Sequence, residues 1–211
     1  MYSLLTTNPD PTIPIVSATY QVKQSEFIAY LYTFSDIAHT SNMETRQTLD
    51  SILANLHNEH KKAAHFTLAS RMINANRQIV ESSSDDKEPK GSAGMPILSV
   101  LRGEQLIDVL CVCVRYFGGI KLGIGGLVRA YTQASLKAIT QAKENGFLES
   151  YNFKETIIIT DSITQYNRIA HYANIHHIKI VQREFLGETF KLILQGQPQN
   201  IQNFLTSIKK Y

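Results

Sequence analysis

The chain has 211 residues, of which 43% are hydrophobic and 18% charged, and its formal net charge is +3. This composition excludes an intrinsically disordered chain, and no apolar run approaches the ~18–20 residues that would cross a bilayer. The first 14 residues contain no Lys or Arg and no apolar segment, so no secretory signal is readable in them. We therefore expect a cytoplasmic protein without a membrane partner.

Hydrophobic periodicity predicts a mixed α+β organisation in the first 146 residues. Residues 15–24 and 26–34 alternate in polarity, which is typical of strands, whereas residues 41–60 carry apolar side chains at helical spacing. Residues 74–94 are rich in Ser, Asp, Lys and Gly, which favours a surface loop. The elements expected in this part are strands at 15–24, 26–34, 64–73 and 107–115, and helices at 41–60, 95–101 and 125–144.

The pattern changes after Gly146. A strand is expected at 151–160, a short helix at 161–173 opened by Asp161 or Ser162, and a last amphipathic helix at 198–209. Between the helices, Leu186-Gly187 separates two short strands and indicates a hairpin. The order β-α-β-β-α is most of a split βαβ unit. We therefore predict two α+β domains, at residues 1–148 and 149–211.

Charge is distributed unevenly along the chain. Residues 1–150 contain 14 basic and 14 acidic side chains, whereas residues 151–211 contain 7 basic and 4 acidic ones. Within the first part, residues 81–88 form an acidic cluster, and residues 109–143 contain no acidic side chain at all. A long stretch of one sign creates a local positive field. For Lys137 and Lys143 we favour the simpler interpretation of a solvated helix face.

The two cysteines, Cys111 and Cys113, lie in an apolar run that predicts a buried strand. The C-x-C spacing is neither a redox C-x-x-C pair nor half of a common zinc site. Free cysteine is among the most frequently buried residue types. We therefore expect both thiols to pack in the core.

Five of the 11 glycines fall between residues 118 and 126, between a predicted strand and a predicted helix. Such a segment offers free backbone N–H groups and the positive end of a helix dipole, which suit a phosphate. Neither a G-x-G-x-x-G nor a P-loop pattern is present. A turn that lets helix and strand pack closely is equally consistent with the glycines, and the nearby cations favour the anion site. The predicted phosphate- or RNA-binding residues are Arg115, Gly118, Gly119, Lys121, Gly123, Gly125, Gly126 and Arg129.

The acidic loop offers carboxylates that could act as oxygen ligands for Mg²⁺. Asp85, Asp86 and Glu88 are weak candidates, because the spacing is not that of an EF-hand and no second ligand cluster is visible. An exposed acidic loop is the favoured interpretation, and we expect no metal and no cofactor. A lone His65 at the start of a strand is more typical of a hydrogen-bonded structural role than of catalysis.

Two stretches together carry a family resemblance. Residues 86–98, DKEPKGSAGMPIL, and residues 114–131, VRYFGGIKLGIGGLVRAY, resemble the signature of the IMPACT family of YigZ-like proteins. The second stretch matches the pattern R-Y-F-G-G-x-x-L-G-x-G-G-L-x-R-A-Y at every fixed position, and Ser25 begins a matching S-x-F-I. In the first stretch Lys87 replaces a glycine and Ser92 replaces a threonine, and Lys87 weakens any metal site. The family positions in and near this loop are His65, Asp86, Glu88, Pro89, Gly91, Ser92 and Gly94.

The resemblance implies a ribosomal-protein-S5-domain-2-like N-terminal domain and a ferredoxin-like C-terminal domain similar to the last domain of translocation factor G. It also implies a role connected with translation, and no agreed enzymatic reaction.

Three functions remain open. We favour a non-catalytic translation-associated regulator that binds RNA or the ribosome, and nothing in the chain indicates DNA specificity. The first alternative is an enzyme acting on a small phosphorylated substrate, which requires that the acidic loop and the glycine segment share a cleft. The second alternative is a protein-binding adaptor in translational stress control, with Tyr116 and Phe117 as candidate anchors.

Overall fold

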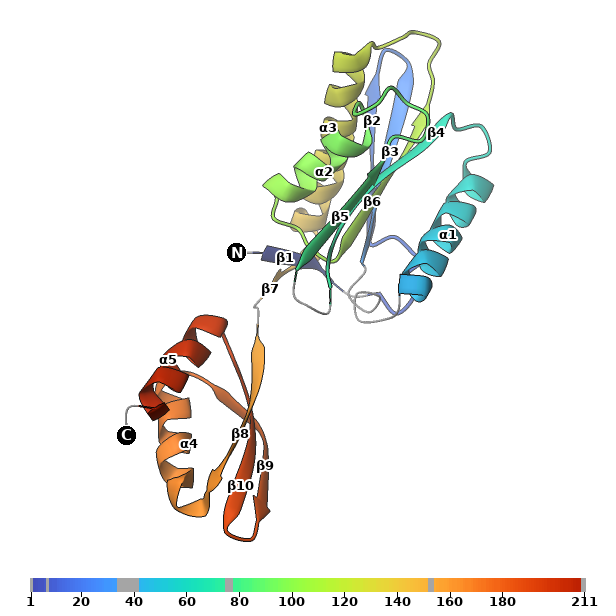
Figure 1. The fold of residues 1–211 in the computed structure, drawn as a ribbon. Coiled ribbons are helices and arrows are strands. Elements are labelled where there is room, and N and C mark those ends of the chain that lie inside the picture. The colour runs from blue at the N-terminus through green and yellow to red at the C-terminus, as the bar shows by residue number, and fades with distance from the viewer. Residues whose placement is uncertain (1, 7, 34–41, 75–77, 152–153, 210–211) are drawn as a thin grey trace. The chain divides into compact units, whose positions relative to one another are not determined.

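The computed structural model describes residues 2–6, 8–33, 42–74, 78–151 and 154–209. Contacts between residues divide the chain into two compact units, 1–151 and 152–211, which are described separately (Figure 1). Both units mix helices and strands, so the chain is an α+β protein. Among the described residues, no helix is long and apolar enough to span a bilayer.

The first unit is built on a five-stranded antiparallel sheet with strand order β2-β3-β6-β4-β5 (Figure 1). The central strand β6 is the apolar run that contains both cysteines, and every residue in it except the last is buried. The strands are β2 (Val16–Val22), β3 (Ser25–Thr33), β4 (His65–Ile73), β5 (Ile79–Ser84) and β6 (Val109–Tyr116).

Helices cover both faces of this sheet. Helix α1 (Asn42–Glu59) packs on one face through Ile52 and Leu56. Helices α2 (Gly94–Gly103) and α3 (Ile124–Glu144) cover the other face and share a core with both cysteines. Both thiols are free and fully buried in this core, so the predicted packing role is confirmed. The same burial raises the pKa of the Cys111 thiol to about 12 and that of Cys113 well above its ordinary value.

Most predicted elements of this unit are confirmed within a few residues, but the polar segment 74–94 contains a strand. β5 is an edge strand that pairs with β4, and its exposed serines hide the alternation expected of a strand. Glu81 of β5 lies opposite Arg71 of β4, and their side chains form an ion pair with Arg71 Nε 2.9 Å from Glu81 Oε1. The predicted ends Phe34 and Ser41 lie outside the described residues.

A small two-stranded sheet completes the first unit. β1 (Tyr2–Leu5) pairs antiparallel with β7 (Leu148–Tyr151), and neither strand was predicted as a separate element. Because β7 pairs with the N-terminal strand, the division between the units falls after residue 151 rather than after residue 148.

The second unit has the predicted order β-α-β-β-α. Its three-stranded sheet has the order β8-β10-β9, and β10 is antiparallel to both neighbours. Both helices contribute to one core, through Ile169 and Ala173 of α4 and Ile201 and Phe204 of α5. The elements are β8 (Glu155–Ser162), α4 (Tyr166–Ile175), β9 (Lys179–Leu186), β10 (Thr189–Gly196) and α5 (Pro198–Lys209).

The predicted start of the first helix in this unit is wrong. Asp161 and Ser162 still belong to β8, where they pair with β10, and a 3₁₀ turn, Ile163–Gln165, precedes α4. The Asp161 carboxylate accepts a hydrogen bond from the Ser162 backbone N–H at 2.7 Å, so it does not cap the helix. Cross-strand pairing therefore prevails over the capping preference of these two residues.

Candidate anion-binding pocket

The two motif-bearing stretches converge on one pocket in the first unit. It has a volume of about 510 Å³ and lies at the N-terminus of α3, next to the start of β4 and the end of β6. Glu88 of the acidic loop and Gly123 of the glycine segment both line it, so the two loops share a cleft. The lining residues are Ala64, His65, Glu88, Pro89, Arg115, Phe117, Lys121, Leu122, Gly123, Ile124 and Leu127.

A buried polar cluster forms part of the pocket wall. The Glu88 side chain is 3% exposed, and its Oε1 accepts hydrogen bonds from Arg115 Nη1 at 2.5 Å and from the Tyr131 hydroxyl at 2.7 Å. Burial raises the pKa of Tyr131 far above its ordinary value, so the phenol stays protonated and donates. Three segments distant in sequence are thereby tied together at one carboxylate.

Arg115 differs from the sequence prediction. It was predicted to offer free positive charge to a phosphate, but it is buried and its charge is compensated by Glu88. The guanidinium carbon lies 5.4 Å from the centre of the Phe27 ring and 5.6 Å from that of Phe117. Its Nε–H has no hydrogen-bond partner among the described residues. Arg115 therefore lines the pocket as half of an ion pair.

His65 presents one ring nitrogen to the same cluster. Its Nδ1 lies 2.8 Å from the backbone carbonyl oxygen of Asp86, which can only accept, so Nδ1 carries a proton and donates. The other nitrogen, Nε2, lies 3.9 Å from Glu88 Oε1. The hydrogen-bonded role expected for His65 is present, and the ring also lines the pocket.

The two aspartates of the acidic loop build the loop itself. Asp85 accepts hydrogen bonds from the backbone N–H groups of Gly91, Ala93 and Gly94 at 2.7, 3.0 and 2.8 Å. Burial alone would raise the pKa of Asp85, but these bonds outweigh it and lower the pKa below its ordinary value. Asp86 Oδ2 accepts from the Phe66 N–H at 2.6 Å.

The three carboxylates named as weak metal candidates all have hydrogen-bond partners within the protein. The carboxylates of Asp85 and Asp86 are taken up by backbone amides, and that of Glu88 by Arg115 and Tyr131. Within the described ranges, no group of three or more His, Cys, Asp or Glu side chains is arranged to hold a metal ion.

Other motif positions of this loop also have structural roles. Gly91 has a φ of +75°, and a Cβ on Gly94 would lie 2.8 Å from the backbone nitrogen of Ser84. Ser92 is fully buried, its N–H donates to the Pro89 carbonyl, and its hydroxyl has no partner among the described residues. The conformation of the loop is therefore fixed by hydrogen bonds to its own backbone and by close packing at Gly94.

Lys87, the departure from the family pattern, lies in the left-handed region with a φ of +67°. This conformation favours glycine, and the Lys87 side chain is exposed, so packing does not compensate for the strain. We expect Lys87→Gly to stabilise the protein by about 0.5–1 kcal/mol. Glycine removes the steric penalty of the left-handed conformation, and its greater conformational entropy in the unfolded chain offsets part of that gain. Urea denaturation measures this shift. Lys90→Gly is the exposed control in the same loop, and an equal gain there would contradict the explanation.

The glycine segment has the packing role that its composition left open, and two of its glycines have positive φ values. Gly118 and Gly126 allow close packing, because a Cβ on Gly118 would lie 2.0 Å from the backbone carbon of Gln24 and one on Gly126 would lie 2.9 Å from Leu122 Cβ. Gly119 and Gly123 have φ values of +81° and +71°.

Gly123 also begins α3 without a side-chain cap, which leaves the N–H groups of the first turn for a ligand or water. At Gly125 the nearest atom to an added Cβ is 3.9 Å away, so a ligand can approach this turn.

The remaining cations lie on two sides of Leu122. Lys121 is exposed and lines the pocket already described, whereas Arg129 lines a neighbouring pocket of about 360 Å³ together with Lys23. Leu122 lines both pockets. The second pocket has no acidic residue in its lining.

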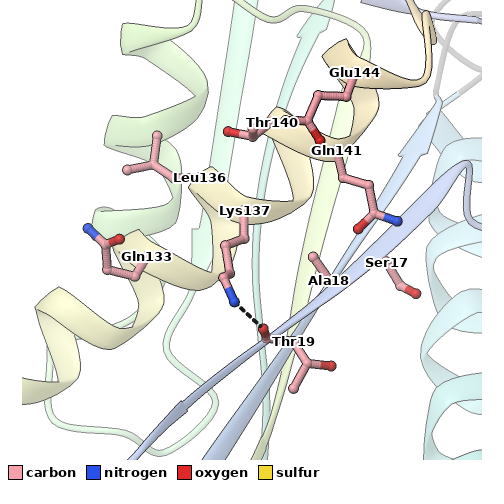
Figure 2. A pocket seen from close by; sticks show the side chains of 9 residues that line it. All are labelled: Ser17, Ala18, Thr19, Gln133, Leu136, Lys137, Thr140, Gln141 and Glu144. Carbon is pink, nitrogen blue, oxygen red and sulfur yellow. Dashed lines mark hydrogen bonds between the residues drawn. The ribbon is translucent and has the colours of Figure 1, made fainter.

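The other two lysines of the acid-free stretch are engaged elsewhere. Lys137 Nζ donates to the Thr19 carbonyl at 3.1 Å, beside a third pocket of about 540 Å³ between β2 and α3 (Figure 2). Figure 2 shows that α3 contributes mainly polar side chains to this third pocket, together with Leu136, and that Ser17, Ala18 and Thr19 of β2 line its other side. Lys143 forms an ion pair with Glu104.

The two aromatic residues proposed as adaptor anchors differ in exposure. The Tyr116 hydroxyl bonds His60 Nδ1 at 2.7 Å, and the ring packs against the core on the α1 side, so Tyr116 is not an anchor. Phe117 is 50% exposed and lines the pocket. Phe117 as a lining residue and Tyr131 as a hydrogen-bond partner of Glu88 were not predicted, although both occupy fixed positions of the family motif.

Comparisons with known proteins agree with the motifs. Residues 23–139 match a family model described as the Impact N-terminal domain. An IMPACT family member from Haemophilus influenzae is 41% identical over 122 residues, which are 56% of this chain and 55% of the relative. The IMPACT family member YigZ from Escherichia coli is 37% identical over 140 residues, which are 63% of this chain and 62% of the relative. The chain thus matches roughly half to three-fifths of the length of these curated relatives.

Among solved structures, a hypothetical protein is similar over 99% of this chain and 92% of its own, with a TM-score of 0.56 and 24% identity. This likeness concerns the fold. The two-domain translational regulator Yih1 is similar over 65% of this chain and 50% of its own, with a TM-score of 0.38 and 22% identity.

Proposed function

The chain belongs to the IMPACT family, and we propose that it is a translation-associated regulator that binds RNA or the ribosome through the N-terminus of α3. The proposal implies a cytoplasmic location and, as partners, RNA, the ribosome or a protein of translation control. We further propose that the two units are the ribosomal-protein-S5-domain-2-like and ferredoxin-like domains that the family resemblance implies.

One observation carries the RNA-binding proposal. Lys121 on one side of Leu122, and Lys23 with Arg129 on the other, flank the uncapped start of α3. Two neighbouring cationic pockets at a helix N-terminus suit successive phosphates of a nucleic-acid backbone. The negative charge of Glu88 does not oppose this, because Arg115 compensates it.

The proposal predicts that Lys121→Ala/Arg129→Ala weakens binding of a mixed-sequence single-stranded RNA by about tenfold or more at low salt. Each phosphate contact on a single strand contributes ~0.7 to the slope of log affinity against log salt. Loss of two contacts should therefore also reduce the magnitude of that slope by about 1.4. Fluorescence anisotropy at several salt concentrations measures both quantities.

Lys137→Ala/Lys143→Ala is the matched control, because it removes the same charge from the same acid-free stretch but away from the start of α3. An equal loss of affinity in the control would mean that net charge, rather than this site, binds the RNA.

A second candidate is an enzyme acting on a small phosphorylated substrate, and the shared cleft favours it. His65 Nε2 and the Glu88 carboxylate lie in the same pocket as Lys121 and the start of α3. A histidine nitrogen beside an anion site is a candidate general base. Phosphate release from mononucleotides and sugar phosphates tests this function, with His65→Gln as the comparison. Release at the rate of a protein-free control would exclude it for these substrates.

A further inference from the structure

The pocket that Lys121 and Phe117 line combines exposed apolar side chains with a cationic side chain at the start of α3. Phe117 is 50% exposed and Ile124 is 62% exposed, and both lie in its lining. Single exposed apolar residues are ordinary, but here two flank one concave pocket that also holds charged groups. Such a combination suits a ligand with an apolar planar part and an anionic part.

The anionic end accommodates a single phosphate. Of the two cations in the pocket, Arg115 is paired with Glu88, so Lys121 supplies the excess positive charge. The uncapped first turn of α3 adds backbone N–H donors beside it, and the open space at Gly125 lets an oxygen approach them.

Two buried polar groups in the pocket wall are incompletely paired. Arg115 is 94% buried, and its Nε–H has no hydrogen-bond partner among the described residues. Both hydrogen bonds to the Glu88 carboxylate end on Oε1, and Oε2 makes none within the part of the chain that the structure describes. Among the described residues, the Arg115 Nε–H is thus a buried donor without a partner, and buried polar groups are nearly always paired. Glu88, whose Oε2 oxygen accepts no hydrogen bond there, lines the same pocket, so the two groups together suit a ligand that carries both an acceptor and a donor.

We propose that this pocket binds one nucleotide, with its base against Phe117 and Ile124 and its phosphate at Lys121 and the start of α3. A nucleobase has a flat face for stacking on an aromatic ring and an edge with donors and acceptors for Arg115 and Glu88. The inference rests on the proposed function, because it assigns the ligand of the same site. A free mononucleotide and the terminal nucleotide of an RNA both offer a base and a phosphate, so both fit the pocket.

Isothermal titration of the full chain with nucleoside 5′-monophosphates, the matching nucleosides and inorganic phosphate tests the proposal. We expect at least one monophosphate to bind about tenfold or more tightly than its nucleoside and than phosphate. Phe117→Ala and Lys121→Ala should each weaken that binding by about tenfold, whereas Lys143→Ala should not. Thermal unfolding of each variant verifies that it is folded. Equal binding of monophosphate and inorganic phosphate would overturn the proposal, since the pocket would then be a simple anion site.

Competition experiments distinguish this inference from RNA binding itself. If RNA binds and no mononucleotide binds or competes, the nucleotide pocket is wrong and the proposed function stands. If mononucleotides bind and neither RNA nor ribosomes do, the pocket assignment stands and the proposed function is wrong. RNAs ending in 5′-phosphate, 5′-hydroxyl or 3′-phosphate identify the source. A preference for one phosphorylated end indicates an RNA terminus, whereas mononucleotide binding that none of the three RNAs displaces indicates a free nucleotide.

Discussion

Replacing Glu88 with alanine is expected to destabilise the first unit by about 3–5 kcal/mol, because it leaves the buried Arg115 guanidinium without its counter-ion. The variant also removes the acceptor of the Tyr131 hydroxyl. Hydrogen exchange of peptides from β6, recorded on the full chain with increasing urea, measures the loss. Peptides from β10 serve as the internal reference, because β10 belongs to the second unit.

Two further variants separate charge from hydrogen bonding. Tyr131→Phe removes one hydrogen bond and should cost about 1 kcal/mol, well below the loss in Glu88→Ala. Glu88→Leu/Arg115→Met removes both charges and should recover a large part of that loss, since apolar pairs often replace buried ion pairs without penalty. If Glu88→Ala cost less than about 1 kcal/mol, the pair would not be held in a low-dielectric site.

The elements of the fold were predictable where one property dominated the local sequence. β6 is apolar from Val109 to Val114, and α3 and α5 have a regular apolar stripe, so all three were predicted near their observed bounds. β5 was missed because an exposed edge strand of serines has little hydrophobic signal. The small β1–β7 sheet joins residues more than 140 positions apart, and local periodicity contains no information about such a pairing.

The site was predictable as a set of residues but not as an arrangement. The glycine segment and the acidic loop were both singled out, and the structure brings Gly123 and Glu88 to one pocket. What the sequence could not provide was the pairing of charges. Arg115 lies near the end of the buried strand β6, and only the tertiary structure brings Glu88 into contact with it. The residue that was predicted to bind phosphate is therefore the counter-ion of Glu88.

The glycine at position 118 has a role that only tertiary structure explains. Its backbone passes over the turn between β2 and β3, and its N–H donates to the hydroxyl of the buried Ser25 at 3.1 Å. Ser25 and Gly118 belong to separate parts of the recognised pattern, and here they are in contact. The two motif segments therefore form one packing unit beside the pocket.

Gly118→Ala is accordingly expected to destabilise the first unit by about 3 kcal/mol or more. The added Cβ would lie 2.0 Å from the Gln24 backbone carbon and 2.2 Å from its oxygen, and backbone atoms cannot yield as a flexible side chain can. The same hydrogen-exchange measurement on β6 peptides reports the loss. Gly126→Ala should reduce the free energy of unfolding by less than Gly118→Ala does, because its Cβ would lie 2.9 Å from the Leu122 Cβ, which belongs to a side chain.

Gly125→Ala completes the series as the matched control within the same segment. Apart from its chain neighbours and the backbone of its own helix, the one atom of the described residues within 4 Å of the added Cβ is Arg129 Nη1, at 3.9 Å, and the residue is helical. Alanine is the better helix former, so this variant should be neutral or stabilising by up to about 1 kcal/mol. Equal losses at positions 118 and 125 would show that flexibility of the whole segment, rather than close approach at Gly118, is what the glycines provide.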